Sequence, residues 1–212
     1  MDLNGPAGRL EALLDTPAAP PGAVVVLAHA HPQLGGTMRA RVLHETTRGL
    51  VRAGAAVLRF NFRGVGLSAG HFDNGEGEAQ DFRAALDEMA GRYAGLPLWA
   101  AGYSFGSWVA WQVGSRDPRV TALVAVAPPL GSYDFASASA GGRPVFLVQA
   151  EQDEVCSLKD ALRFYGRLPE PKELVVIDAA DHLFDGKASE VGDAVEDLAK
   201  GLDRKGASHA RS

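Results

Sequence analysis

Short runs of apolar, largely β-branched residues alternate with amphipathic stretches along nearly all of this 212-residue chain. The apolar runs are continuous, as is typical of strands buried on both faces, whereas the stretches between them have helical periodicity. Strands that alternate with helices form a parallel sheet covered by helices on both sides. The pattern therefore predicts an α/β fold with a mostly parallel, doubly wound sheet.

We expect about seven strands and five helices. One edge strand is predicted at Gly8–Leu14. The six buried strands are predicted at Ala23–Ala28, Ala55–Asn61, Leu96–Gly102, Val120–Val126, Pro144–Ala150 and Leu174–Asp178. The helices are predicted at Arg39–Ala53, Glu76–Arg92, Ser104–Gly114, Ser157–Gly166 and Ala188–Leu202.

The length and composition are those of one globular domain. The chain is 46% hydrophobic and 22% charged, which is ordinary for a soluble protein, and it is long enough to bury a sizeable core. We expect a single domain over residues 1–203, followed by a flexible C-terminal tail over residues 204–212. Nothing in the sequence indicates the oligomeric state.

Charge and hydropathy bear on partners and location. The net charge of −5 argues against nucleic acid and anionic membranes as partners. The longest apolar runs have the length of strands, and no basic segment followed by an apolar one opens the chain, so we expect no membrane span and a cytoplasmic location. The single cysteine, Cys156, excludes an intrachain disulfide framework and is expected to be a small buried residue.

The most informative motif is Gly102-Tyr103-Ser104-Phe105-Gly106, a G-x-S-x-G between an apolar run and a helical pattern. A serine hydroxyl becomes a useful nucleophile when it is held clear of its neighbours and beside a base. A sharp turn from strand to helix exposes it in this way, and the flanking glycines let strand and helix approach closely. The motif therefore predicts that Ser104 is a nucleophile.

A serine nucleophile needs a histidine base and a carboxylate that orients the base. In hydrolases with this type of turn the chain order is serine, acid, histidine. Only His182 and His209 follow Ser104, and His209 lies in the predicted tail. His182 comes just after a predicted strand, where loops gather at the carboxyl edge of the sheet, and is therefore the predicted base.

The acid is expected beyond the strand that ends at Ala150. Asp153 is preferred because it lies far enough past the strand to turn back towards His182, and a short side chain holds an imidazole more rigidly. Glu151 and Glu154 stay as alternatives.

The negative charge that develops during attack on a carbonyl requires preorganised donors. We expect the backbone N–H of Phe105, directly after the nucleophile, to be one of them. The second is expected in the loop after the strand Ala23–Ala28, where Pro32 has no N–H and the His31 amide is the predicted donor. Residues 127–143 have no amphipathic pattern, so we expect no cap domain and an open, shallow site.

Two other motifs suggest different chemistry. His29 and His31 form an H-x-H, but the chain supplies no further ligand motif, so no metal is expected. Gly64, Gly66 and Gly70 do not have the G-x-G-x-x-G spacing of a dinucleotide loop, and we interpret them as a turn that lines the site. No cofactor is expected.

With these residues in place, the chain resembles the α/β-hydrolase superfamily and, within it, a small lidless bacterial branch of serine esterases. The resemblance runs from about Gly5 to Leu202. The matching segments are His31–Met38, Arg59–Ser68, Gly70–Glu78, the elbow Gly102–Gly106, the acid loop Asp153–Val155 and the base loop Asp181–Phe184.

The resemblance implies an α/β-hydrolase fold and a cofactor-free serine hydrolase that acts on small acyl esters. Three alternatives stay open: a thioesterase, a small-peptide amidase with the same triad, and a non-catalytic binding module on a hydrolase scaffold. A dehalogenase or an epoxide hydrolase is disfavoured, because these enzymes have an aspartate where this chain has Ser104.

Overall fold

The computed structural model describes residues 1–209, apart from the side chains of residue 2 and residues 202–209. Its strands are β1 (Asp2–Gly5), β2 (Gly8–Asp15), β3 (Ala23–Ala28), β4 (Ala55–Phe60), β5 (Leu98–Tyr103), β6 (Val120–Val126), β7 (Val145–Ala150) and β8 (Lys172–Ile177). Its helices are α1 (Arg41–Arg52), α2 (Glu76–Arg92), α3 (Phe105–Gly114), α4 (Leu158–Arg167), α5 (Ala188–His209) and the short 3₁₀ helix η1 (Pro32–Leu34).

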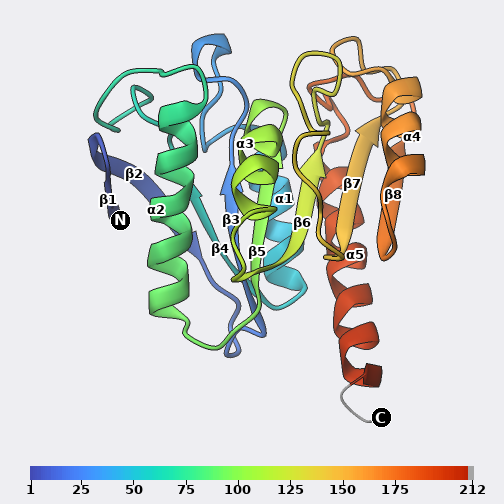
Figure 1. The fold of residues 1–212 in the computed structure, drawn as a ribbon, viewed down its shortest axis with the longest axis horizontal. Helices are drawn as coiled ribbons and strands as arrows, with labels where there is room; N and C mark the ends of the chain where they lie inside the picture. Colours follow the sequence, from blue (N-terminus) through green and yellow to red (C-terminus); the bar gives the residue numbers. More distant parts are fainter. Residues whose placement is uncertain (210–212) are drawn as a thin grey trace.

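The strands form one sheet in the order β1-β2-β4-β3-β5-β6-β7-β8 (Figure 1). From β4 to β8 all neighbours are parallel, whereas β1 pairs antiparallel with β2 and β2 antiparallel with β4. This is the mostly parallel sheet that the sequence predicts. The predicted α/β-hydrolase architecture is confirmed.

Helices cover both faces of the sheet because the central strands are apolar on both sides. In β3, Val24 and Val26 pack into the layer that contains α2 and α3, and Val25 and Leu27 pack into the layer that contains α1 and α5. Figure 1 shows α2, α3 and α4 in front of the sheet and α1 and α5 behind it. A continuous apolar run is therefore what each buried strand requires.

The ends of the elements differ from the predictions by a few residues, and one strand is additional. Asp2–Gly5, which forms the edge strand β1, has only Leu3 as an apolar side chain, so its sequence shows no strand period. At the other end, α5 continues to His209 rather than ending at Leu202. The flexible tail over residues 204–212 stays a prediction, since residues 210–212 lie outside the described part of the chain.

The strand order positions the functional loops. The chain passes from β3 through α1 to β4 on one side, and then through α2 to β5 on the other side of β3. The carboxyl ends of β3 and β5 thus lie at a topological switch point, where open α/β sheets bind ligands. The loop over residues 127–144, where a cap could be inserted, contains no helix or strand, so no cap domain covers this edge.

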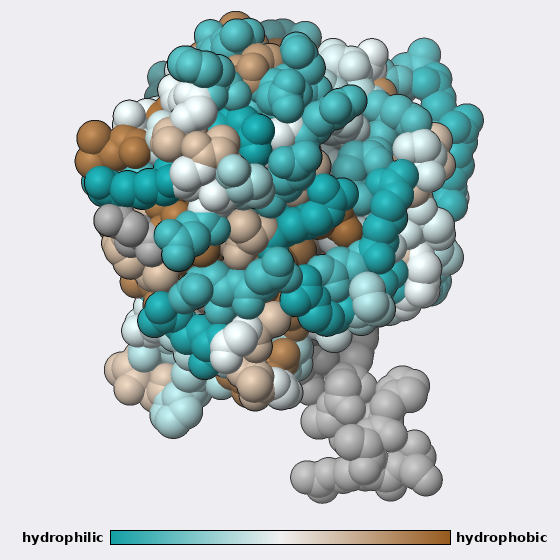
Figure 2. All heavy atoms as spheres, turned by 60° about the vertical axis from the view of Figure 1, so that its left-hand side comes forward, coloured by the Kyte–Doolittle hydropathy of each residue, from teal (hydrophilic) through white to brown (hydrophobic). Residues whose placement is uncertain are grey.

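One face of the molecule has an ordinary polar character. Figure 2 shows that the face formed by the N-terminal edge of the sheet and α2 is mostly hydrophilic, with apolar side chains in separate spots. Within the described residues, no helix has the length and apolar composition needed to cross a lipid bilayer.

Candidate active site

Ser104 occupies a strained turn between β5 and α3. Its backbone has φ 51° and ψ −123°, a region that residues other than glycine rarely adopt. Hydrogen bonds hold the turn: the Ser104 N–H donates to the Val126 carbonyl at 2.9 Å, and the N–H and hydroxyl of Ser107 donate to the Ser104 carbonyl at 2.8 and 2.6 Å. The turn is therefore fixed to the neighbouring strand β6 and to the first turn of α3.

The two glycines of the motif are required by close backbone contacts. A Cβ on Gly102 would overlap the backbone of Gly106, and a Cβ on Gly106 would overlap the carbonyl groups of Ala28 and His29. The start of α3 thus lies directly against the ends of β3 and β5. This close packing brings the loop after β3 next to Ser104.

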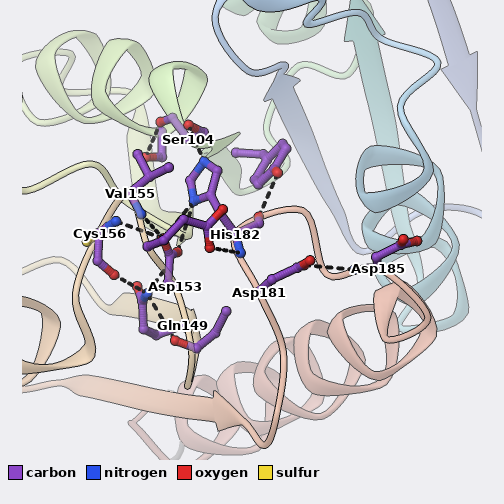
Figure 3. A network of polar contacts seen from close by, with 12 residues as sticks. Ser104, Gln149, Asp153, Val155, Cys156, Asp181, His182 and Asp185 are labelled. Atoms are coloured by element: carbon purple, nitrogen blue, oxygen red, sulfur yellow. Dashed lines mark hydrogen bonds and ion pairs between the residues drawn. The ribbon is translucent and has the colours of Figure 1, made fainter.

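The structure brings Ser104, His182 and Asp153 together at the carboxyl edge of the sheet (Figure 3). The Ser104 Oγ lies 3.0 Å from His182 Nε2, and His182 Nδ1 lies 2.9 Å from Asp153 Oδ2 and 3.0 Å from Oδ1. Because the carboxylate can only accept, Nδ1 carries the ring proton and Nε2 is free to accept from the serine. All three residues are buried.

Four donors surround the Asp153 carboxylate. Besides His182, the backbone N–H groups of Val155 and Cys156 donate to Oδ1 at 2.9 and 2.7 Å, and Gln149 Nε2 donates to Oδ2 at 3.0 Å. Burial alone raises the pKa of Asp153, but the hydrogen bonds from His182, Cys156 and Val155 outweigh it and bring the pKa below its usual value. The carboxylate is therefore ionised at neutral pH.

The two glutamates considered as alternative acids have other contacts. Glu151 Oε2 accepts the backbone N–H of Ala179 at 2.8 Å, and Glu154 Oε2 accepts the backbone N–H of His182 at 3.3 Å. Glu154 thus supports the loop that carries His182 but does not bond the imidazole. Of the three carboxylates, Asp153 is the one that reaches the ring.

Tyr103, the residue before the nucleophile, also supports His182. Its hydroxyl donates to the His182 carbonyl at 2.8 Å, and the two rings stack with centroids 5.7 Å apart. Burial, together with the nearby charge of Asp153, raises the pKa of Tyr103, so its hydroxyl remains a donor. Sequence reasoning missed this role, because the motif leaves this position unspecified.

His29 and His31 have different environments. His29 is fully buried, and its Nε2 accepts the Phe62 N–H at 3.0 Å while its Nδ1 donates to the Ala30 carbonyl at 2.6 Å. Burial lowers the pKa of His29 to about 4, so the ring is neutral. It therefore fixes the loop after β3 to the loop after β4, a role that the H-x-H pattern did not reveal.

The two predicted oxyanion donors lie at the start of α3 and in the loop after β3, which approach each other closely. Phe105 is the first residue of α3, and its ring lies 5.0 Å from the ring of His31. The His31 carbonyl accepts the N–H groups of Leu34 and Gly36, each at 3.0 Å. Within the described residues, neither the Phe105 N–H nor the His31 N–H donates to a protein acceptor. Neither N–H is therefore occupied by an acceptor from this part of the chain.

Cys156 is a buried residue of the acid loop, as predicted. Burial raises the pKa of its thiol to about 11, so it is a neutral, unreactive group near pH 7. Among the described residues, no group of three or more histidine, cysteine or acidic side chains is placed to hold a metal ion.

Comparison with known proteins agrees with this fold. The family model described as serine aminopeptidase, S33, matches residues 19–140. An uncharacterized protein of Rickettsia prowazekii is 35% identical over 92% of this chain and 85% of its own length. The structure of an α/β serine hydrolase homologue from Coxiella burnetii is 34% identical, covers 93% of this chain and 95% of its own, and has a TM-score of 0.88.

A second solved structure, from Xanthomonas campestris, is described as an α/β serine hydrolase without a lid. It is 30% identical, covers 92% of this chain and 90% of its own, and has a TM-score of 0.86. The chain therefore belongs to the serine aminopeptidase S33 family of α/β hydrolases. Within that class it is similar to the lidless serine hydrolases, as the sequence motifs predict.

Proposed function

We propose that this chain hydrolyses small carboxylic esters through a covalent acyl-enzyme. Ser104 attacks the acyl carbon while His182 takes the hydroxyl proton, and His182 then gives that proton to the departing alcohol. Water, deprotonated by the same imidazole, releases the acid and restores Ser104. The observation that carries the proposal is the continuous contact from Ser104 Oγ to His182 and from His182 to the Asp153 carboxylate.

Asp153 keeps the imidazole in the tautomer that accepts from the serine and stabilises the imidazolium that forms during attack. The N–H groups of Phe105 and His31 hold the carbonyl oxygen as it becomes negative. Phe105 opens α3, so the positive end of the helix dipole adds to this stabilisation. These assignments need no group other than the chain's own residues.

Amide hydrolysis is the second candidate, and the aminopeptidase description of the matching family favours it. The same three residues serve ester, thioester and amide substrates. The classes differ in the leaving group, which His182 must protonate fully for an amine. Rates on an ester, a thioester and an anilide with the same acyl group rank the three activities, and we expect the ester to be cleaved fastest.

The first prediction concerns Ser104→Ala. Turnover of p-nitrophenyl acetate is expected to fall by about four orders of magnitude or more, because the acyl-enzyme can no longer form. Labelling by a fluorophosphonate, followed by mass spectrometry of the peptide, is expected at Ser104 in the wild type. Ser189→Ala, an exposed serine in the first turn of α5, is the matched control.

If Ser104→Ala retains most of the activity, Ser104 is not the nucleophile. A wild-type chain that neither turns over esters nor reacts with the fluorophosphonate would instead be a binding module on a hydrolase scaffold.

A further inference from the structure

Gln149 is a polar residue in the otherwise apolar strand β7. It is fully buried and lies one residue before the strand ends, below the acid loop. Its Nε2 donates to Asp153 Oδ2 at 3.0 Å and to the Cys156 carbonyl at 2.8 Å, while the Ala150 carbonyl lies farther away at 3.3 Å. The two amide hydrogens thus join the Asp153 carboxylate to the far end of its own loop (Figure 3).

The orientation of this amide follows from its neighbours. Turning it over would place Oε1 against a carboxylate and a carbonyl, which repel it. In the observed orientation, Oε1 has no hydrogen-bond partner in the described part of the chain, although it is buried. An unsatisfied buried carbonyl destabilises the fold. A methionine of similar size would leave no such atom, so Gln149 is best explained by its donor.

We propose that Gln149 is a positioning residue for the reaction, which acts through Asp153 by holding its carboxylate in line with His182. This inference rests on the proposed function, since it assigns Asp153 as the acid. Groups of the protein itself hold both carboxylate oxygens: two backbone N–H groups of the loop donate to Oδ1, and Gln149 donates to Oδ2. His182 therefore meets a carboxylate whose rotamer is already set.

The Gln149 hydrogen bond also competes with His182 for the negative charge of Asp153. Oδ2 accepts from both Gln149 and His182, so removing Gln149 leaves more of its charge to the imidazole. The other titratable groups that face the carboxylate are the Cys156 thiol and the Tyr103 hydroxyl, which are neutral near pH 7. Glu154 adds a negative charge on the His182 side. Loss of Gln149 therefore favours the protonated imidazole.

The test is Gln149→Met, which keeps the size of the side chain and removes its donors. We expect kcat for a short p-nitrophenyl ester to fall about tenfold with KM changed less than about twofold, because the acid is positioned less well. The acid limb of the rate profile should move about half a pH unit higher. The thermal midpoint should fall, since the Cys156 carbonyl loses its donor and removal of the unsatisfied Oε1 offsets only part of that loss.

Gln152→Met is the matched control. It makes the same substitution in the same loop, but at an exposed side chain. It is expected to keep the wild-type kcat and pH profile. If Gln149→Met behaves like Gln152→Met, Gln149 has no positioning role.

Gln149→Glu gives an independent answer if the methionine variant does not fold. Two adjacent buried carboxyl groups cannot both ionise readily, so the pair keeps a proton that a carboxyl O–H can donate across the contact. We expect kcat above that of Gln149→Met near pH 7, and a loss of activity at higher pH that the wild type does not show. A profile that matches the wild type overturns the proposal.

A spectroscopic readout separates this proposal from the proposed function. The Nδ1–H proton between His182 and Asp153 is expected to give a downfield proton NMR resonance, which needs no substrate. Its position should differ between the wild type and Gln149→Met, and should be unchanged in Gln152→Met. An unchanged resonance in Gln149→Met rejects the positioning role, whereas absence of ester turnover in the wild type with a shifted resonance rejects only the proposed function.

Discussion

At the scale of single residues, the site contains two locally unfavourable features, which the rest of the fold must stabilise. Ser104 has a backbone conformation that favours glycine, and the buried Gln149 Oε1 has no hydrogen-bond partner among the residues that the structure describes. Such costs are typical of functional positions. The first could be predicted from the sequence, since G-x-S-x-G is a local pattern, whereas the second depends on the loop that folds over the end of β7.

The sequence could indicate the site residues that follow from local patterns, but not those that depend on contacts between distant loops. Ser104, Asp153 and His182 follow from a motif, a chain order and the ends of predicted strands. His29 was not identified as a structural residue because its partner, the Phe62 N–H, belongs to a distant loop. Contacts between loops have no signature in local sequence.

Asp153 allows a prediction for acid stability. Its pKa in the folded protein lies below the usual value of 3.8, so its ionised form stabilises the fold above that pH, and this contribution is lost as the pH falls through the lowered pKa. The free energy of unfolding of Asp153→Asn should therefore lie below that of the wild type near pH 5, and the difference should shrink towards about pH 2. Urea titrations at each pH measure it. A difference that grows in that range would contradict the assignment.

At the scale of elements, a buried ion pair joins the loop after β4 to α2. Arg63 donates to Asp81 through Nη2 at 2.8 Å and Nε at 3.0 Å, and the Arg63 N–H donates to the same carboxylate at 3.0 Å. The hydrogen bond and charge of Asp81 raise the pKa of Arg63. The resemblance includes Arg63 within the segment Arg59–Ser68, but its partner 18 positions later could not be predicted from spacing.

Asp81→Asn is therefore expected to destabilise the protein. It leaves the largely buried guanidinium without its full counter-charge, which typically costs about 3 kcal/mol. Glu88→Gln, which breaks the exposed pair with Arg92 on the same helix, should cost less than about 1 kcal/mol. The free energy of unfolding from urea denaturation measures both. Equal effects would show that burial does not determine the strength of these pairs.

The boundaries of the strands were also predictable only where they follow from a local pattern. Buried strands such as β3 and β6 were located to the residue, because both ends of an apolar run are visible in the sequence. The edge strand β1 was missed, because its pairing with β2 depends on the backbone rather than on an apolar pattern.

At the scale of the whole molecule, two apolar layers lie on opposite faces of one sheet. Trp99 belongs to the layer with α1 and α5, and Trp111 to the layer with α2 and α3. Alternate side chains of the same strands enter each layer, so neither layer can lose its packing without disturbing the other. The single domain predicted over residues 1–203 therefore has a direct test in its unfolding.

We expect one cooperative unfolding transition. Variants that retain only Trp99 or only Trp111 should each have the same urea midpoint by fluorescence as by far-UV circular dichroism. Two separated midpoints within one variant would indicate that the layers unfold independently.

The absence of a cap domain bears on how such an enzyme selects its substrates. A covering domain lets an enzyme reject a molecule by its outline, because the whole molecule must fit an enclosed volume. Here the loop over residues 127–144 contains no helix or strand that could form such a cover, and the part of a substrate that extends beyond the proposed oxyanion donors would stay in water. Rates should then follow the basicity of the departing group more closely than its size, so that the selection is made by reactivity.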